Sequence, residues 1–359
     1  MKHLTVKTVA LLTVLVLTFL LCAPVARAEG KKEIQLRFHE TGQFKIMVMS
    51  DFQDYVNEEK KSANEKSIQL MNRAIAQEKP DLVVMNGDQI GGDMDGHQLQ
   101  EYIKQMVTPL EDHQVPWLIT FGNHDEDAEK ALEEGWDKIR QLDYYMSFEH
   151  NVNQPSMSGV EGHSGHSKNT IAVGDMYKLI YDAAGQTPLF NVWALDSNRY
   201  DWSDTQLGGY DWIKFEQILW YYNTSKELEA KFGKLNALMF FHIPLPEWAL
   251  MSANALRYDV QGHKFEDECP SKLNSGLFSA VLSRGDVRGI FAGHDHVNDY
   301  MGKYMGITLG YDANVGFQTY GLGGEVNDSL RGVRIINLDA SDLSSFESHM
   351  LYATELGMK

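Results

Sequence analysis

Nine polar residues of this chain are of the types that bind divalent cations or transfer protons, and they fall into five short clusters. The clusters are Asp51 with Gln53; Asp88; Asn123, His124 and Asp125; His242; and His294 with His296. Carboxylate, imidazole and amide ligands at about seven positions suit two divalent ions better than one. Two ions about 3.5–4 Å apart can deprotonate a shared water and neutralise the oxygens of a phosphoryl group. The residue types therefore predict metal-assisted hydrolysis of a phosphoester.

Two of the clusters are more specific than the others. Gly122–Asp125 reads Gly-Asn-His-Asp, and Gly293–His296 carries alternate histidines that can hold neighbouring ions. A single Asp after a strand is more often a turn residue. His242 taken alone would more often be a buried core histidine. The shared site is indicated by the occurrence of all five clusters in this order.

The clusters divide into metal ligands and proton-transfer residues. Asp88 is short and anionic, so it can bridge two ions. His124 is left outside the metal shell and is free to protonate a leaving oxygen. Asp125 is expected to orient the imidazole ring of His124.

Each cluster follows an apolar run, which indicates the elements that position it. The runs cover residues 44–49, 82–85, 117–121, 238–241 and 289–292. Short runs rich in Val, Ile and Phe predict buried strands. Helical spacing of apolar residues predicts helices over Ser67–Gln77, His97–Leu110 and Asp211–Lys231. The alternation predicts an α/β fold, in which ligands gather at the carboxyl ends of the strands.

Composition limits the classes of partner. The 359 residues are 43% hydrophobic, enough for a packed core, and carry a net charge of −18. This charge opposes general binding to nucleic acid or anionic membranes, so no stable nucleic-acid partner is expected. No repeat or long linker divides residues 29–359, which are expected to form one domain.

The first 28 residues have the pattern of a secretory signal peptide. Lys2 and Lys7 precede an apolar run over residues 9–21, and Ala26–Ala28 matches a small-x-small cleavage site. An uncleaved membrane anchor is the alternative, although the run is short for a membrane span. The pattern predicts a secreted, periplasmic or cell-surface protein with no stable membrane insertion after cleavage.

The order of the clusters resembles that of the calcineurin-like metallophosphoesterase superfamily, whose pattern is D-x-H, G-D, G-N-H-[DE], a lone His and G-H-x-H. The resemblance runs from about Phe44 to Tyr320. It is strongest to the purple-acid-phosphatase-like branch that includes the plant type 29 phosphatase and related fungal enzymes. The segments that carry it are Phe190–Asn198, Gly209–Ile213, Phe241–Glu247, Asn274–Phe278 and Gly293–Asp299. It implies a four-layer β-sandwich flanked by helices, with a dimetal site at the carboxyl ends of strands.

The resemblance also implies a distribution of ligands. One metal falls to Asp51, Asp88 and His296, and the other to Asp88, Asn123, His242 and His294. His124 takes the place of the general acid, with Asp125 as its partner.

Two residues depart from the family pattern. Gln53 stands where the common pattern has His, and a neutral amide oxygen favours Mn, Mg, Ca or Fe over Zn at that site. Alternatively, Gln53 does not ligate. Gly91 stands where purple acid phosphatases carry a Tyr, so no purple iron(III) colour is expected.

These observations predict a secreted metallophosphoesterase that uses a metal-bridging hydroxide and His124 as general acid. The resemblance favours a monoesterase over a diesterase. A secreted non-catalytic metal- or phosphate-binding protein on the same fold is the alternative, supported by Gln53 and the missing Tyr. The retained pair of His124 and Asp125 argues against it, because a binding protein has no need for a leaving-group acid.

Overall fold

The computed structural model describes residues 31, 33–56, 59, 61–163, 170–202, 206, 208–312, 314–322 and 330–358. The predicted signal peptide, residues 1–28, lies outside them. The chain divides into Met1–Glu33 and Ile34–Lys359, and all helices and strands identified here belong to the second unit. Within the described residues, no helix has both the length and the apolar composition that a membrane crossing requires.

A five-stranded sheet is built around three parallel strands, β2 (Gln43–Met49), β3 (Leu82–Asn86) and β4 (Trp117–Thr120). Two antiparallel strands, β15 (Gly332–Asp339) and β16 (Glu347–Tyr352), complete the order β16-β15-β2-β3-β4. Every residue of β3 and β4 is buried. Such strands read as continuous apolar runs because both faces of the sheet are covered.

A seven-stranded sheet has the order β1-β7-β8-β11-β12-β14-β13. Its parallel centre consists of β8 (Pro188–Ala194), β11 (Asn236–Phe240), β12 (Val287–Ala292) and β14 (Ile307–Tyr311). The flanking strands are β1 (Leu36–Arg37), β7 (Met176–Tyr181) and β13 (Met301–Tyr304). Two small ribbons pair β5 (Gly162–His163) with β6 (Thr170–Ile171), and β9 (Tyr200–Asp201) with β10 (Gly209–Tyr210).

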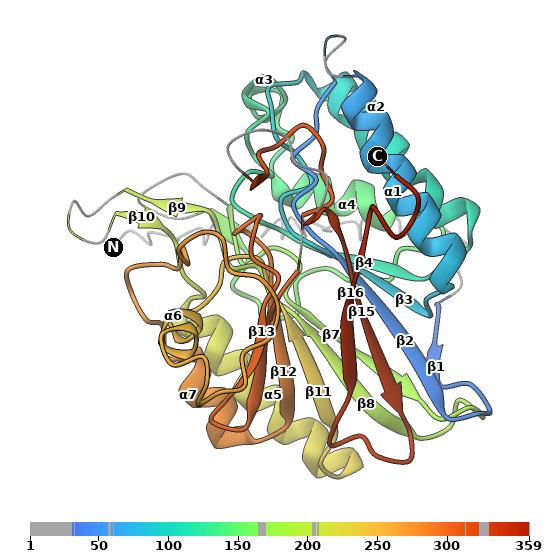
Figure 1. The fold of residues 1–359 in the computed structure, drawn as a ribbon, viewed down its shortest axis with the longest axis vertical. Coiled ribbons are helices and arrows are strands. Elements are labelled where there is room, and N and C mark those ends of the chain that lie inside the picture. The colour runs from blue at the N-terminus through green and yellow to red at the C-terminus, as the bar shows by residue number, and fades with distance from the viewer. Residues whose placement is uncertain are drawn as a thin grey trace, which may run out of the picture. The chain divides into compact units, whose positions relative to one another are not determined.

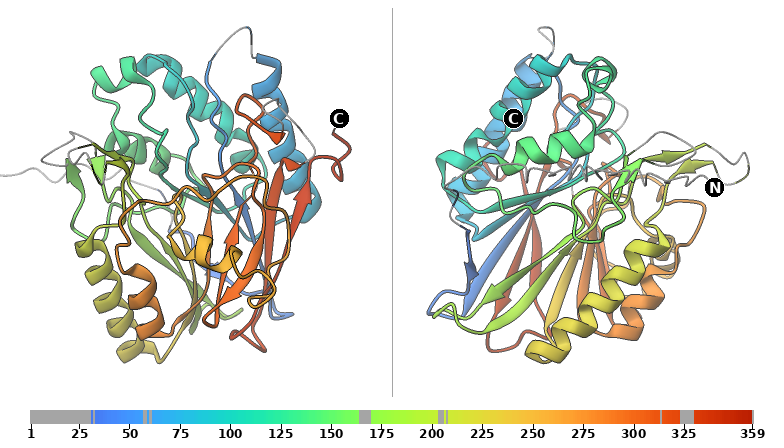
Figure 2. Two further views of the ribbon diagram at one scale, coloured as in Figure 1. Left: turned by 60° about the vertical axis from the view of Figure 1, so that its left-hand side comes forward. Right: turned by 180° about the vertical axis from the view of Figure 1, so that it is seen from behind.

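Helices cover the outer face of each sheet (Figures 1 and 2). On the five-stranded sheet lie α1 (Lys61–Glu78), α2 (Gly96–Asp112), α3 (Glu129–Glu133) and α4 (Lys138–Met146). On the seven-stranded sheet lie α5 (Phe215–Phe232), α6 (Glu247–Ser252) and α7 (Leu277–Arg284). One apolar cluster fills the space between the sheets, and one lies beneath each helical layer. The predicted four-layer α/β sandwich is confirmed.

The predicted elements agree with the observed ones except at their ends and in their number. The five apolar runs correspond to β2, β3, β4, β11 and β12. Helix α5 begins at Phe215 rather than Asp211, because the Gln217 side chain accepts the Lys214 backbone N–H and so caps the helix there. The other strands, among them β7 and β13 to β16, lie outside the five predicted runs.

Candidate metal centre

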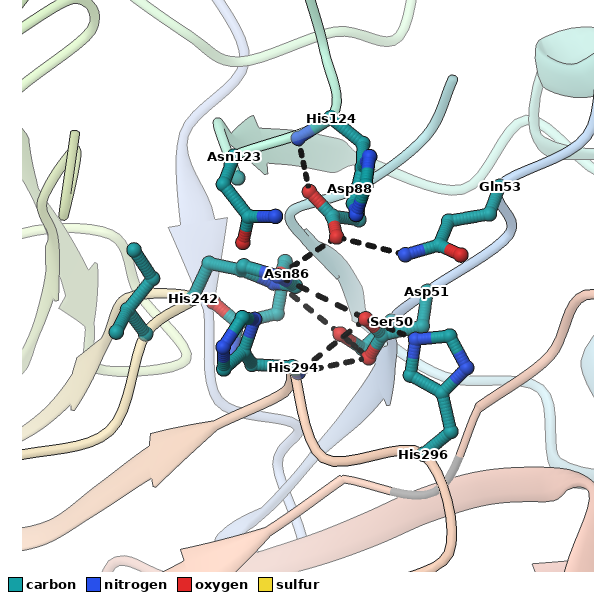
Figure 3. Close-up of polar contacts among 12 residues, drawn as sticks. Ser50, Asp51, Gln53, Asn86, Asp88, Asn123, His124, His242, His294 and His296 are labelled. Atoms are coloured by element: carbon teal, nitrogen blue, oxygen red, sulfur yellow. Dashed lines mark hydrogen bonds and ion pairs between the residues drawn. The ribbon is translucent and has the colours of Figure 1, made fainter. Parts of the chain in front are cut away.

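The carboxyl ends of β2, β3, β4, β11 and β12 meet at one edge of the two sheets, and the five polar clusters follow those ends (Figure 3). Parallel pairing of β2 with β3 and of β3 with β4 aligns these ends in one sheet, and pairing of β11 with β12 aligns them in the other. The packing of the two sheets against each other brings the two sets together. Asp51, Asp88, Asn123, His242 and His296 are all buried. Residues from widely separated parts of the chain therefore share one polar centre.

The loops that leave β2 and β3 are held against each other by backbone hydrogen bonds. Asp51 N donates to Gly87 O at 3.1 Å, and Gln53 N donates to Asp88 O at 2.9 Å. Asp51, Gln53 and Asp88 have φ values of 55°, 42° and 54°, and His294 has 80°. Left-handed backbone at non-glycine residues is strained and persists only where the surroundings hold it. The packed loops therefore fix these side chains in a geometry that the isolated chain would not favour.

Gly122 and Gly293 must be glycines because polar side chains of the centre lie close to their Cα atoms. A Cβ at Gly122 would lie 2.1 Å from Asp88 Oδ1, and a Cβ at Gly293 would lie 1.9 Å from Ser50 Oγ. Either contact is far shorter than van der Waals distance, so any side chain there would displace Asp88 or Ser50. The glycines of these motifs thus make room for the polar side chains.

Two carboxylates lie among the histidines. Asp88 Oδ2 lies 3.0 Å from His242 Nε2, and Asp51 Oδ1 lies 3.6 Å from His242 Nε2 and 3.4 Å from His296 Nε2. His242 Nδ1 lies 2.9 Å from the Asn86 carbonyl, to which it donates. This hydrogen bond directs Nε2 of His242 into the centre, as outer-shell carbonyls do for metal-binding histidines. Ligand atoms of Asp88, His242 and His294 lie within 4.8 Å of one another.

Several polar atoms of the centre are available to bind divalent ions because they lack hydrogen-bond partners. Among the described residues, Asn123 Oδ1, His242 Nε2 and His294 Nε2 are buried and have no hydrogen bond of good geometry. The amide of Asn123 is oriented by its Nδ2, which donates to the Tyr200 hydroxyl at 2.9 Å. Buried acceptors without donors cost free energy unless a cation completes them. An amide oxygen, two imidazoles and two nearby carboxylates match the ligand set expected for a dinuclear centre.

The charges of the centre are strongly coupled. Burial opposes ionisation of His242, but Asp88 and Asp51 outweigh it and raise the pKa of His242 to about 10. Burial and the charge of His242 lower the pKa of His294 to about 3. Although burial opposes it, His242 and His124 hold the pKa of Asp88 well below its usual range. The two carboxylates therefore need positive charge beside them, which His242 supplies as a proton and a divalent ion can supply instead.

His124 lies at the rim of this centre with a carboxylate behind its ring. Its Nδ1 pairs with Asp127 Oδ2, and its side chain is 33% exposed. The Asp127 N–H donates to the His124 carbonyl at 2.8 Å, a turn that brings Asp127 back onto the ring. Burial works against the charged form, but Asp88 and Asp127 raise the pKa of His124 to about 9. This upward shift favours the protonated form that a general acid requires.

The prediction that Asp125 orients His124 is wrong. Both oxygens of Asp125 accept backbone N–H groups, from Gly122 at 2.7 Å, Gln89 at 2.8 Å, Asp88 at 3.1 Å and Ile90 at 3.3 Å. Asp125 is fully buried and joins the loop after β3 to the loop after β4. Burial and the charge of Asp88 raise the pKa of Asp125 to about 7, while amide N–H donors favour the carboxylate. Its role is to position these loops, and Asp127 takes the place beside His124.

Gln53 contacts the centre through its nitrogen. Its Nε2 donates to Asp88 Oδ2 at 2.9 Å, and its Oε1 accepts from the Thr319 hydroxyl at 2.6 Å. Thr319 Oγ1 also lies 3.1 Å from His296 Nδ1, and Tyr320 stacks on the His296 ring at 4.0 Å between centroids. Because the Thr319 proton goes to Gln53, Thr319 accepts from His296 Nδ1–H and leaves Nε2 of His296 facing Asp51. In this arrangement Gln53 is a bridge between Asp88 and His296 rather than a ligand.

The path of the backbone explains why a side chain is missing at position 91. A Cβ at Gly91 would lie 2.0 Å from the carbonyl oxygen of Gln53. A tyrosine could occupy this position only if the loop after β2 moved away. The absence of the tyrosine ligand is therefore tied to the local fold as well as to the sequence.

Three residues near the centre were missed by reasoning from the sequence. Asp127 lies three residues beyond His124, a turn spacing that could have identified it. Thr319 and Tyr200 come from a loop and a short ribbon whose sequences carry no recognisable motif. Their position is a product of the fold.

Comparison with known proteins agrees with this geometry. The family model described as calcineurin-like phosphoesterase matches residues 44–298. An Arabidopsis thaliana protein named "Probable inactive purple acid phosphatase 29" is 32% identical over 320 residues, which is 83% of this chain and 78% of that protein. "Phosphatase DCR2" of Saccharomyces cerevisiae is 29% identical over 281 residues, which is 74% of this chain and 46% of that protein. A dimetal phosphatase structure from Danio rerio aligns with a TM-score of 0.52 at 12% identity, over 86% of this chain and 98% of the other, and shows a shared fold.

Proposed function

The chain belongs to the calcineurin-like phosphoesterase family, and we propose that it is a metal-dependent hydrolase of phosphomonoesters. One observation carries the proposal. Two buried acceptors without donors, Asn123 Oδ1 and His294 Nε2, lie with the His242 imidazole among two buried carboxylates, and the pKa of His124 at the rim is raised. Such a set of groups suits cations and a proton donor acting on one substrate.

The side chains divide between holding ions and handling the leaving group. Asp51, Asp88 and His296 would hold one ion, and Asp88, Asn123, His242 and His294 the other. When bound, divalent ions supply Lewis acidity toward phosphoryl oxygens and activation of water. His124 donates its proton to the departing oxygen, because Asp127 occupies Nδ1 and leaves Nε2 for the substrate. Arg199 donates to the Asn123 carbonyl at 2.7 Å and pairs with Asp127, so it steadies the segment that carries His124.

The name of the yeast relative, a phosphatase, supports the choice of a monoester substrate. Hydrolysis of p-nitrophenyl phosphate and bis-p-nitrophenyl phosphate with Mn, Mg, Fe, Zn or Ca tests it. The proposal expects faster turnover of the monoester with at least one of these metals. Faster turnover of the diester would make the chain a phosphodiesterase.

A second candidate function is a non-catalytic metal- or phosphate-binding protein. The nitrogen contact of Gln53, the missing Tyr at Gly91 and the word "inactive" in the name of the plant relative favour it. The pairing of His124 with Asp127 favours the hydrolase, because binding alone needs no proton donor.

Two substitutions separate these functions. In a hydrolase, His124→Ala lowers turnover by about 10²–10⁴ while the metal content is unchanged. Asp88→Asn loses metal and activity together, since it removes the carboxylate placed to bridge the ions. A metal-loaded wild-type protein with no turnover of either ester would identify a binding protein.

We further propose that the chain is exported and that residues 1–28 are removed. Its support is the pattern of a basic start, an apolar run and Ala26–Ala28. Mass spectrometry of the protein from the medium or the cell envelope should find Glu29 as the first residue. A membrane-bound chain that retains residues 1–28 would identify an anchor instead.

A further inference from the structure

One face of the ribbon formed by β9 and β10 is a row of aromatic rings, which we call the aromatic shelf and define as Tyr200, Trp202 and Tyr210. Tyr200 and Tyr210 are direct cross-strand partners. Trp202 is two residues beyond Tyr200, and alternate residues of an extended chain share a face. The rings of Tyr200 and Tyr210 are 5.5 Å apart at 29°, and those of Tyr200 and Trp202 are 6.4 Å apart at 18°. The three rings are nearly parallel and form an offset stack in the order Tyr210, Tyr200, Trp202, with Trp202 at its outer end.

The aromatic shelf begins at the candidate metal centre. The Tyr210 ring meets the His294 ring edge-on at 4.4 Å, and the Tyr200 hydroxyl accepts from Asn123 Nδ2 at 2.9 Å. The Tyr200 ring is also 6.4 Å from the His124 ring. The shelf is thus joined to two candidate ligands and to the proton donor.

The outer end of the shelf is open to solvent. The side chain of Trp202 is 71% exposed, whereas most tryptophans bury the greater part of their surface. Trp202 reaches the centre through Tyr200, and exposed apolar surface rimmed by polar residues marks ligand-binding grooves and interaction sites. Figure 1 shows the ribbon of β9 and β10 projecting at the edge of the fold.

We infer that the aromatic shelf binds the leaving group of the substrate and that this group is a planar aromatic alcohol. The inference rests on the proposed function. The departing oxygen must lie within about 2.6–3.2 Å of His124 to receive its proton. Tyr200 is the ring beside His124, so a group attached to that oxygen extends along the stack, past Tyr200 toward the exposed ring of Trp202.

The reaction balances as an ordinary hydrolysis. The bond between phosphorus and the aryl oxygen breaks, and an oxygen from water forms the new bond to phosphorus. The proton of His124 goes to the aryl oxygen, and a proton from the attacking water restores His124. The products are the phenol and inorganic phosphate, so no oxidant or further co-reactant is needed. Stacking on the shelf adds affinity that an alkyl leaving group lacks.

The test compares two substrates in three variants of the full chain. With 1-naphthyl phosphate, Trp202→Ala should lower kcat/KM by about 5- to 30-fold, which is about 1–2 kcal/mol. With glycerol 3-phosphate the loss should be several-fold smaller, so the ratio of the two kcat/KM values falls. Trp202→Phe keeps a ring and should retain most of the ratio. Trp212→Ala is the matched control, because Trp212 packs under Lys214 outside the shelf, and it should leave the ratio unchanged.

A binding measurement removes the chemistry of the leaving group from the comparison. Phenylphosphonate and methylphosphonate carry the same charged head and cannot release an alcohol. As competitive inhibitors of the wild type, phenylphosphonate should bind at least fivefold tighter, and Trp202→Ala should abolish most of this preference. Equal losses for both substrates, or an unchanged inhibitor preference, would overturn the shelf as a binding surface. Failure to hydrolyse any phosphoester would instead remove the proposed function.

Discussion

Asp125 and Asp127 lie on either side of one turn, and the structure predicts opposite consequences for their loss. Each Asp125 oxygen accepts two backbone N–H groups, from Gly122 and Asp88 on one side and Gln89 and Ile90 on the other. In Asp125→Asn an NH₂ group replaces one oxygen, so two backbone N–H groups face a donor whichever way the amide turns. Each buried donor left unsatisfied costs about 1–3 kcal/mol. The free energy of unfolding should therefore fall by about 2–6 kcal/mol.

Asp127→Asn should behave in the opposite way. The Asp127 side chain is 26% exposed and pairs with His124 and Arg199, and such partly exposed pairs contribute about 0–1 kcal/mol to stability. Its loss removes one of the charges that raise the pKa of His124. Turnover of p-nitrophenyl phosphate should fall at least about tenfold, less than in His124→Ala. The high-pH limb of kcat/KM should move to lower pH, because the proton on His124 is then lost at lower pH.

Urea unfolding followed by tryptophan fluorescence, with the same metal present, measures the first effect, and steady-state kinetics measure the second. A free energy of unfolding of Asp125→Asn within about 1 kcal/mol of the wild type would show that Asp125 does not hold these loops. The other possible contradiction is that Asp127→Asn retains full turnover with an unmoved pH profile. In that case Asp127 does not position the ring of His124.

Four further predictions follow from particular contacts. Lys138 and Asp196 form a buried ion pair at 2.8 Å, so Lys138→Met should lower the free energy of unfolding in urea by about 3–5 kcal/mol. Adding Asp196→Asn to this variant should restore part of the lost stability, because it removes the unpaired charge. Burial raises the pKa of Asp175 to about 7, so the folded protein binds a proton that the unfolded chain has lost. Loss of this proton on unfolding should lower the free energy of unfolding by up to about 1.4 kcal/mol per pH unit as the pH rises from about 4 to 7. The Asp175→Asn variant mimics the protonated acid and should lack this part of the pH dependence. Gln53→His should tighten binding of the more weakly held metal at least about tenfold in calorimetry, because an imidazole ligand replaces an amide that donates to Asp88. Unchanged affinity would contradict the conclusion that Gln53 bridges Asp88 and His296 without binding metal. Iron-loaded protein should lack a strong visible charge-transfer band, because Gly91 has no room for a tyrosine, and a purple colour would show that another phenolate ligates.

Much of the fold and most of the candidate centre could be predicted because their information is local. Buried parallel strands are mostly apolar, so the runs over residues 82–85 and 117–121 stand out in the sequence and correspond to β3 and β4. A polar residue directly after such a strand lies at the carboxyl edge of the sheet, whatever the rest of the chain does. The convergence of Asp51 with Asp88 follows from strand direction within one sheet, whereas His242 joins them through the packing of the second sheet against the first.

The remaining features depend on which neighbours the packed loops bring together. Asp125 and Asp127 are both close to His124 in sequence, and the backbone turn from His124 to Asp127 places the Asp127 carboxylate, and not that of Asp125, on the imidazole ring. Whether Gln53 presents its oxygen or its nitrogen is set by Thr319, which is 266 residues away along the chain. The aromatic shelf exists only because the ribbon of β9 and β10 folds against His294 and Asn123. Hydrogen bonds and ring contacts act over a few ångströms, so residues far apart in sequence acquire such roles only through the tertiary fold.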